Sequence, residues 1–255
     1  MIRTLKEQGF LFSELVKRDF KKKYKGTYLG MIWSLLSPLI SLLIMSLVFG
    51  SFFSEYEEHY TIYLFCGNII FAYFSDATSG GMMTLLDNAP VFTKVKVPKY
   101  LFVLSRNASS FINFCLTLVV FFIFCVIFEI NFTPAFLLLI FPLILLMLFN
   151  VGMGLILSAV YVFFRDLAYL WSIFVMLVMY LSAVFYPVSI LPDFLGKLIY
   201  LNPVYVYIRF FRVIVLEGTA PSVELCVLAL IYSAIALGLG ALLYRKLSGK
   251  FLYYV

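Results

Sequence analysis

Residues 134–164 read PAFLLLIFPLILLMLFNVGMGLILSAVYVFF and contain no charged side chain. A helix needs roughly 20 apolar residues to cross the hydrocarbon core of a bilayer, so this stretch predicts a membrane-spanning helix. The whole chain has the same character, because 64% of its 255 residues are hydrophobic and only 13% are charged. Soluble domains carry about a quarter charged residues to face water. The composition excludes a soluble enzyme, a disordered chain and a disulfide-rich secreted domain, and it predicts an all-α integral membrane protein.

Five further stretches are long and apolar enough to span a bilayer. The six predicted transmembrane helices cover residues 30–53, 60–86, 101–128, 134–164, 167–186 and 223–244. Between the last two, residues 187–222 are apolar but interrupted by prolines and charges, namely Pro192, Asp193, Pro203, Arg209, Arg212 and Pro221. Short apolar pieces of this kind are typical of re-entrant helices. We therefore expect short re-entrant helices on the outer side before the last span.

The basic residues are distributed unevenly between the predicted loops. If the N-terminus is cytoplasmic, six spans place all 19 Lys and Arg residues on the cytoplasmic side except Lys197, Arg209 and Arg212. The first outer loop, residues 54–59, is acidic and has no basic residue. This distribution follows the positive-inside rule and predicts a multi-pass protein of the inner (cytoplasmic) membrane with both termini in the cytoplasm. It also accounts for the net charge of +6 without a nucleic-acid partner.

The segment before the first span, residues 1–25, has a helical pattern of its own. Leu5, Phe12, Val16 and Phe20 recur at helical spacing, and basic residues occupy the other faces. This pattern predicts an amphipathic helix that lies in the cytoplasmic interface of the membrane. A flexible basic anchor is the alternative interpretation.

The sequence contains none of the common motifs for catalysis, nucleotide binding or metal binding. There is no G-x-x-x-x-G-K-[ST], no H-E-x-x-H and no G-x-S-x-G, and the single histidine, His59, follows the acidic residues of the first outer loop. The four cysteines lie in apolar stretches without C-x-x-C spacing, which indicates packing roles. We therefore expect no catalytic residue, no metal and no cofactor in this chain.

Two ionisable residues are predicted to lie inside spans, where such residues are rare. Asp76 in the second span and Arg106 in the third fall at similar depths when positions are counted at about 1.5 Å per residue. We interpret them as an intramembrane pair that faces the bundle interior or a wet cavity, and a proton relay is the alternative. Small residues at helical spacing, such as Ala234 and Gly238, and the glycines at 152 and 154 predict close helix contacts.

Several local patterns, in order along the chain, resemble those of one transporter family. They are Lys25-Gly26-Thr27-Tyr28-Leu29-Gly30-Met31-Ile32-Trp33 before Ser37-Pro38, Asn88 through Lys94, Lys96 and Pro98, Asn113-Phe114, Phe164-Arg165-Asp166, Tyr186-Pro187, Asn202-Pro203, and Arg212 before Gly218. Together they resemble the ABC-2-type permease subunits of bacterial polysaccharide exporters, which move lipid-linked O-antigen, teichoic acid or capsular chains across the cytoplasmic membrane. The resemblance covers nearly the whole chain.

The resemblance implies that the chain is one half of a transporter. Two copies would pair as a homodimer, and each would dock a separate ABC ATPase subunit that binds ATP and Mg. The amphipathic helix and the cytoplasmic loop 87–100 would form the docking surface. The residues expected to couple to the ATPase are Asn88, Lys94, Lys96, Pro98, Arg165 and Asp166. The alternative interpretation is that the lysines of this loop only follow the topology rule.

The resemblance also suggests substrate contacts on the outer side, where the re-entrant segment would close the exit. Arg209 and Arg212 form a basic pair that is suited to a pyrophosphate-bearing lipid or, alternatively, to snorkelling toward lipid headgroups. Tyr180 and Tyr186 are candidates for an aromatic sugar path, although tyrosines also gather at membrane interfaces.

The predicted function is ATP-driven export of a lipid-linked polysaccharide. Export of a drug, a lipid or another small hydrophobic molecule is the alternative. An intramembrane enzyme, a channel and a secondary transporter fit less well, because the spans carry few charged residues and no internal repeat is evident.

Overall fold

The computed structural model describes residues 2–25, 30–95 and 97–254, and these residues form only helices and the turns between them. The longer helices are α1 (Ile2–Tyr24), α2 (Trp33–Phe53), α3 (Tyr60–Asp87), α5 (Tyr100–Ile127), α6 (Ile140–Tyr161), α7 (Leu167–Leu181), α9 (Pro203–Leu216) and α10 (Val223–Leu247). The short ones are α4 (Ala89–Phe92), α8 (Asp193–Leu198), η1 (Gly30–Ile32), η2 (Pro134–Leu139), η3 (Val188–Ile190), η4 (Ile199–Leu201) and η5 (Ser248–Tyr253). The predicted all-α class is confirmed over the described part of the chain.

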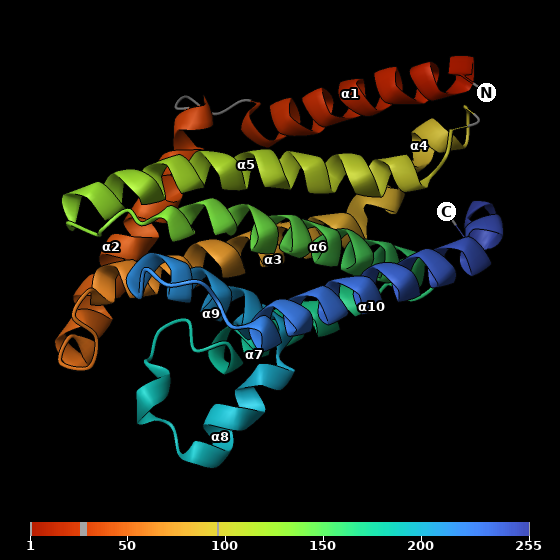
Figure 1. Cartoon of the computed structure of the whole chain (residues 1–255). Coiled ribbons are helices and arrows are strands. Elements are labelled where there is room, and N and C mark those ends of the chain that lie inside the picture. Colours follow the sequence, from red (N-terminus) through yellow and green to blue (C-terminus); the bar gives the residue numbers. More distant parts are fainter. Residues whose placement is uncertain (1, 26–29, 96, 255) are drawn as a thin grey trace.

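Helix α3 lies inside the bundle and contacts α2, α5, α6, α7 and α9 (Figure 1). Most of its side chains are buried. The ring of Phe74, for example, packs between Phe149 of α6 and Trp171 of α7, with both pairs of ring centroids 6.2 Å apart. The core of the molecule is therefore built around α3.

Four described segments are long and apolar enough to cross a bilayer, namely Leu35–Phe53, Tyr100–Ile127, Pro134–Tyr161 and Val223–Phe251. A fifth arises if Asp193–Leu201 and Pro203–Leu216, bent by 106° at their junction, form one broken span. Helix α7 has only 15 residues, about 22 Å at 1.5 Å per residue, which is shorter than a bilayer core of about 30 Å. Length and composition thus support four or five spans, and the count of six stays a prediction.

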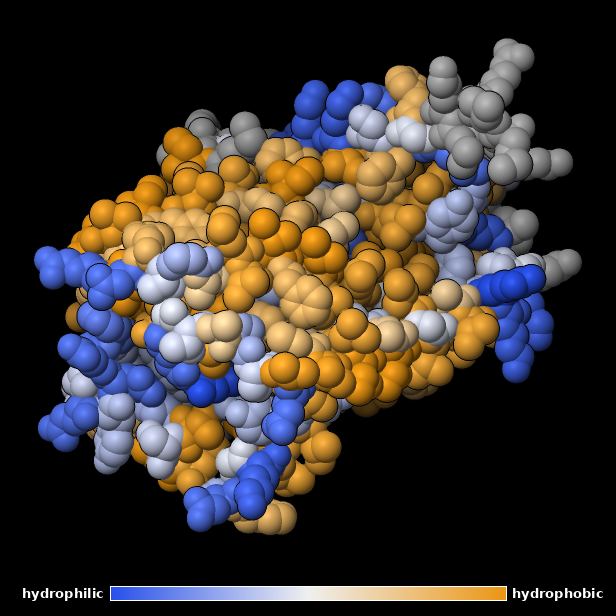
Figure 2. Space-filling view, in the orientation of Figure 1, coloured by the Kyte–Doolittle hydropathy of each residue, from blue (hydrophilic) through white to orange (hydrophobic). Residues whose placement is uncertain are grey.

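The surface has the pattern of a membrane protein. Figure 2 shows hydrophobic residues over the middle of the visible face and hydrophilic residues gathered toward its two ends. Large apolar side chains also lie outside, since Leu47 of α2 and Leu137 of η2 are 72% and 75% exposed. Such extensive apolar exposure is unfavourable in water and favourable in lipid.

Helix α1 forms as its residue pattern predicts, but its placement differs from the predicted one. A helix in the plane of the interface would cross the spans steeply, whereas α1 lies lengthwise beside α5 (Figure 1). Leu15 is buried there in a cluster that also contains Phe92, Leu101 and Phe102. Phe12 of the predicted apolar stripe packs against this cluster.

The two marked ends of the chain lie at the same end of the bundle as α4 (Figure 1). The predicted re-entrant segment forms η3, α8, η4 and α9, of which α9 is almost entirely buried. Its bend falls at Asn202, whose side-chain oxygen accepts a hydrogen bond from the amide of Val204 at 3.0 Å, while Pro203 opens α9. This is the N-cap arrangement expected where a proline starts a helix.

Helices α6 and α10 pack closely through glycines. A Cβ atom added at Gly152 would lie 2.5 Å from the carbonyl oxygen of Ala236, and one added at Gly240 would lie 2.5 Å from the carbonyl oxygen of Gly152. A Cβ added at Gly238 would meet nothing within 4 Å. The close contact predicted for α10 therefore exists, but it uses Ala236 and Gly240 instead of Ala234 and Gly238.

Candidate coupling and translocation site

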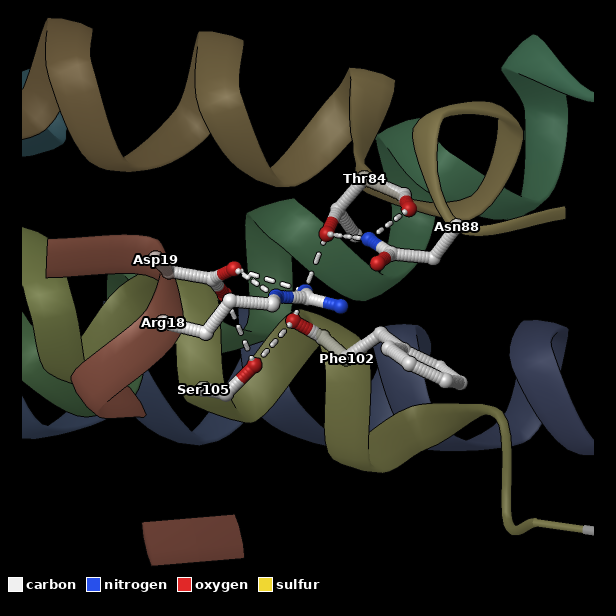
Figure 3. Close-up of polar contacts among 6 residues, drawn as sticks. All are labelled: Arg18, Asp19, Thr84, Asn88, Phe102 and Ser105. Atoms are coloured by element: carbon white, nitrogen blue, oxygen red, sulfur yellow. Dashed lines mark hydrogen bonds and ion pairs between the residues drawn. The ribbon is translucent and has the colours of Figure 1, made fainter. Parts of the chain in front are cut away.

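The predicted coupling loop starts at a turn that Asn88 fixes. The Asn88 Nδ2 group donates a hydrogen bond to the carbonyl oxygen of Thr84 at 2.8 Å, and Asn88 is 7% exposed (Figure 3). Further along the loop, Lys94 is exposed and Pro98 is half-buried, while Lys96 lies outside the described residues. Asn88 thus shapes the turn, and Lys94 is available at the surface.

Lys99, which sequence reasoning did not select, ties this loop to the C-terminal segment. Its Nζ donates to the carbonyl oxygen of Ser248 at 3.0 Å and lies 5.6 and 5.4 Å from the ring centroids of Phe92 and Phe251. These distances are within the range of cation–π attraction, and burial lowers the pKa of Lys99. Its partner Ser248 is 149 residues away in sequence, so no local pattern indicates this contact.

Arg165 and Asp166 are exposed in the turn between α6 and α7. The nearby Phe163 ring lies 6.0 Å from the ring of Phe251, the same residue that contacts Lys99. The predicted loop 87–100, the α6–α7 turn and the C-terminal segment therefore lie together at one end of the bundle.

Helix α1 is joined to this end by a polar contact (Figure 3). Arg18 Nη2 donates to Asp19 Oδ1 at 2.7 Å, and the hydroxyl of Ser105 on α5 donates to Asp19 Oδ2 at 3.1 Å. Sequence reasoning missed this contact between α1 and α5, although one signal was available: Asp19 is a single acid among the basic residues 17–23.

The structure brings together the two predicted intramembrane residues. Arg106 Nη2 lies 3.1 Å from Asp76 Oδ1, and a third group joins them, because Lys23 Nζ lies 3.2 Å from the same oxygen. The guanidinium of Arg106 occupies the space that a Cβ atom at Gly80 would take. Gly80 thus allows Arg106 to lie flat against α3, one turn from Asp76.

The structure gives the two predicted outer arginines different surroundings. Arg209 forms an ion pair with Glu217 at 2.7 Å and is partly exposed. Arg212 is 2% exposed, and its guanidinium donates to the carbonyl oxygens of Tyr63, Ala183 and Val184 at 2.9–3.3 Å. Arg212 also stacks on the Tyr63 ring, with Cζ 3.4 Å from the centroid. Arg212 is therefore enclosed, unlike the accessible basic residue that the sequence predicts.

The acidic first outer loop lies near these arginines. Burial raises the pKa of Glu57, and the positive charges of Arg212 and Arg209 oppose that shift.

Tyr180 and Tyr186 lie near the C-terminal end of α7. The hydroxyl of Tyr186 donates to the carbonyl oxygen of Tyr180 at 2.8 Å. The Tyr180 side chain is 57% exposed, whereas Tyr186 lines an apolar cavity of about 640 Å³ together with Phe174 and Leu177 of α7. The two tyrosines thus face different surroundings.

These features define a helical membrane protein whose middle is hydrophobic at the surface. Polar side chains at one end of the bundle connect its helices and loops. Among the described residues, no group of three His, Cys, Asp or Glu side chains is placed to hold a metal ion.

Comparison with known proteins gives the family. Residues 11–216 match the model of the ABC-2 type transporter family. Since this match covers most of the chain, the protein belongs to that family, whose members are transmembrane subunits without a nucleotide site of their own.

The chain is also similar to permeases that carry the name O-antigen export system permease protein RfbA. One, from Klebsiella pneumoniae, is 26% identical over 163 residues, covering 63% of this chain and 62% of the relative. Another, from Myxococcus xanthus, is 26% identical over 170 residues, or 65% of each chain. A second Klebsiella pneumoniae permease is 25% identical over 195 residues, or 76% of this chain and 74% of its own length. The chain thus spans less than two thirds of the first two relatives.

Proposed function

We propose that this chain is the membrane subunit of an ATP-driven exporter of a lipid-linked polysaccharide of the O-antigen, teichoic acid or capsule type. The observation that carries the proposal is the family match over residues 11–216, together with relatives that are named for O-antigen export.

In the proposed assembly, two copies of the chain pair in the cytoplasmic membrane. Each copy spans the membrane six times with both termini in the cytoplasm, in line with the positive-inside distribution of its basic residues. Each copy docks one ABC ATPase subunit, which binds ATP and Mg.

Coupling to the ATPase occurs at the end of the bundle that carries α4. One hydrophobic cluster there includes Leu15 of α1, Phe92 of α4, Leu101 of α5 and Phe251 of the C-terminal segment. Close-packed side chains transmit displacement. Movement of the docked ATPase against the exposed Lys94, or against Arg165 and Asp166, therefore shifts these elements together. ATP drives the change by binding differently to the two states of the assembly.

On the outer side, Arg209 and Tyr180 are the candidates for contact with the cargo, because both are accessible. Arg212 serves as a positioning residue for the segment that ends α7. The segment 187–222 acts as a re-entrant closure of the exit.

One observation favours the alternative cargo, a small hydrophobic molecule. The cavity of about 640 Å³ beside α7 is lined mostly by apolar side chains such as Phe174, Leu177 and Leu239. Apolar cavities of 300–1,000 Å³ are typical of sites for small ligands.

Depletion of the chain in its native host distinguishes export of a polysaccharide from export of a small hydrophobic molecule. The polysaccharide proposal expects loss of polymer from the cell surface and accumulation of lipid-linked polymer inside, with both reversed by the wild-type chain. Surface labelling and extraction of the lipid-linked pool measure these quantities. Unchanged surface polymer in depleted cells would contradict the proposal and favour the small hydrophobic cargo.

A further inference from the structure

Three cavities meet where the end of α1 approaches α3 and α5. The first, of about 490 Å³, lies between α2, α3 and α5 and is lined by Lys23 and Asp76. The second, of about 580 Å³, follows α3 and is lined by Asp76 and Arg106. The third, of about 350 Å³, lies beside α1 and is lined by Lys23 and Arg106. Each of these three residues therefore lines two of the three cavities.

This junction has more positive than negative charge. Asp76 Oδ1 is shared between Lys23 Nζ and Arg106 Nη2, at 3.2 and 3.1 Å, so one carboxylate faces two cations. Arg18, Lys22, Asp19 and Asp87 also line the third cavity, and Arg18 is paired with Asp19. The three cavities together therefore carry four positive and three negative side chains. A cation without a counter-charge is unfavourable near the hydrocarbon of a membrane. The junction is therefore suited to an anion.

The two central cations are both held in position and accessible. The Lys23 and Arg106 side chains are 35% and 22% exposed, so a ligand in the cavities can reach them. The absent side chain at Gly80 leaves room for the Arg106 guanidinium against α3. Ser110, 1% exposed, and Asn68 add a hydroxyl and an amide to the lining of the first cavity.

We infer that Lys23 and Arg106 form a binding site for a phosphoryl group in these cavities. The planar fork of an arginine binds two phosphate oxygens at once, and a lysine adds a compact positive charge. Asp76 keeps the two cations together when the site is empty, and it competes with the anion for them. A metal cation is disfavoured at Asp76 because Lys23 and Arg106 both contact its carboxylate.

The phosphoryl group can come from a lipid headgroup or from a soluble phosphate. The lipid source rests on the proposed function, in which the phosphate of a carrier lipid enters the transporter at this junction. The residues that line the cavities recognise only the phosphoryl group, which both sources have in common.

The test is titration of the full chain in phosphatidylcholine nanodiscs with inorganic pyrophosphate, at constant ionic strength, by calorimetry. We expect binding that weakens about tenfold in Arg106→Gln and Lys23→Gln, because a hydrogen bond to a charged group contributes about this much. Lys21→Gln is the matched control, because Lys21 is on the same helix and lines none of the three cavities; it should bind as the wild type does.

The variant Asp76→Asn should change the pyrophosphate affinity in the opposite direction. Removal of the competing carboxylate should tighten pyrophosphate binding, whereas weaker binding would overturn the inference. Gel filtration and thermal unfolding check that each variant is folded, and Lys23→Gln, at the accessible end of α1, keeps the test valid if Arg106→Gln does not fold.

A second arm replaces soluble pyrophosphate with nanodiscs that contain dioleoyl phosphatidic acid, and native mass spectrometry counts the bound lipid. Binding in this arm alone identifies a lipid headgroup, and binding in both arms identifies the phosphoryl group itself. Binding in neither arm, or equal loss in Lys21→Gln, overturns the inference. These readouts need no ATPase, so their failure is distinct from a failure of the proposed exporter function.

Discussion

At the residue scale, Arg212 of α9 is a buried side chain that makes four hydrogen bonds to backbone carbonyl oxygens. It joins three elements, because its guanidinium binds the carbonyl oxygen of Tyr63 on α3 and those of Ala183 and Val184 after α7. Gly67 makes room for it, since a Cβ atom there would lie 2.7 Å from Arg212 Nη2. Arg212 thus holds the end of α7 against α3.

We predict that Arg212→Ala lowers the free energy of unfolding by about 3 kcal/mol or more, because each buried carbonyl left unpaired costs about 1–3 kcal/mol. Arg212→Lys should recover only part of the loss, because one ammonium cannot reproduce the fork of the guanidinium. Thermal unfolding of the purified chain in detergent measures both variants.

Arg209→Ala is the matched control for these variants. Its ion pair with Glu217 is partly exposed, and exposed pairs contribute less than about 1 kcal/mol. An equal loss in Arg209→Ala and Arg212→Ala would contradict the role assigned to Arg212.

Sequence reasoning worked at the residue scale where a residue was unusual for its surroundings. Asp76 and Arg106 are ionisable residues in apolar stretches, and the structure places them 3.1 Å apart. It did not find the burial of Arg212 or the contact of Lys99 with Ser248, because these depend on partners far away in sequence.

At the element scale, the contact between α6 and α10 depends on which residues face each other. Without large side chains between them, two membrane helices can approach until their backbones touch, and packing then replaces the missing hydrophobic driving force. Gly152 and Gly240 have this role, because each lies against the backbone of the other helix.

We predict that Gly152→Ala or Gly240→Ala destabilises the chain by about 1–3 kcal/mol, because an added methyl forces the helices apart. Gly238→Ala, on the same helix as Gly240, has open space around it and should be neutral or stabilising by up to about 1 kcal/mol. Thermal unfolding in one detergent compares the three variants, and equal losses in all of them would disprove the close contact.

The ends of the helices show what the sequence can and cannot specify. The predicted bounds 60–86 match those of the helix α3, and 223–244 lies within α10, because apolar runs bounded by polar residues determine both. Of these two helices only α10 is apolar enough to count as a candidate span, so the span assigned to α3 stays a prediction. The predicted span 167–186 is wrong at its end, since α7 stops at Leu181. Ala183 then adopts a positive φ of 47°, and its carbonyl oxygen binds Arg212. That contact is tertiary, so the apolar run alone did not reveal the break.

At the scale of the whole molecule, the elements predicted to meet the ATPase contact one another directly or through the C-terminal segment. Loop 87–100, the turn after α6 and the C-terminal segment share contacts through Lys99 and Phe251, and α1 is joined to α5 through Asp19. The family resemblance found the first two from local motifs. It did not indicate the C-terminal segment, because aromatic packing has no local signature.

The central claim is that this chain works with a separate ATPase, and affinity purification of the chain from its native host tests it most directly. We predict that an ABC ATPase subunit is recovered in equal amount. Lys94→Glu should reduce its recovery, while Lys197→Glu, exposed on α8, should not. Recovery of the chain without any ATPase, in a detergent that preserves other membrane complexes, would contradict the claim.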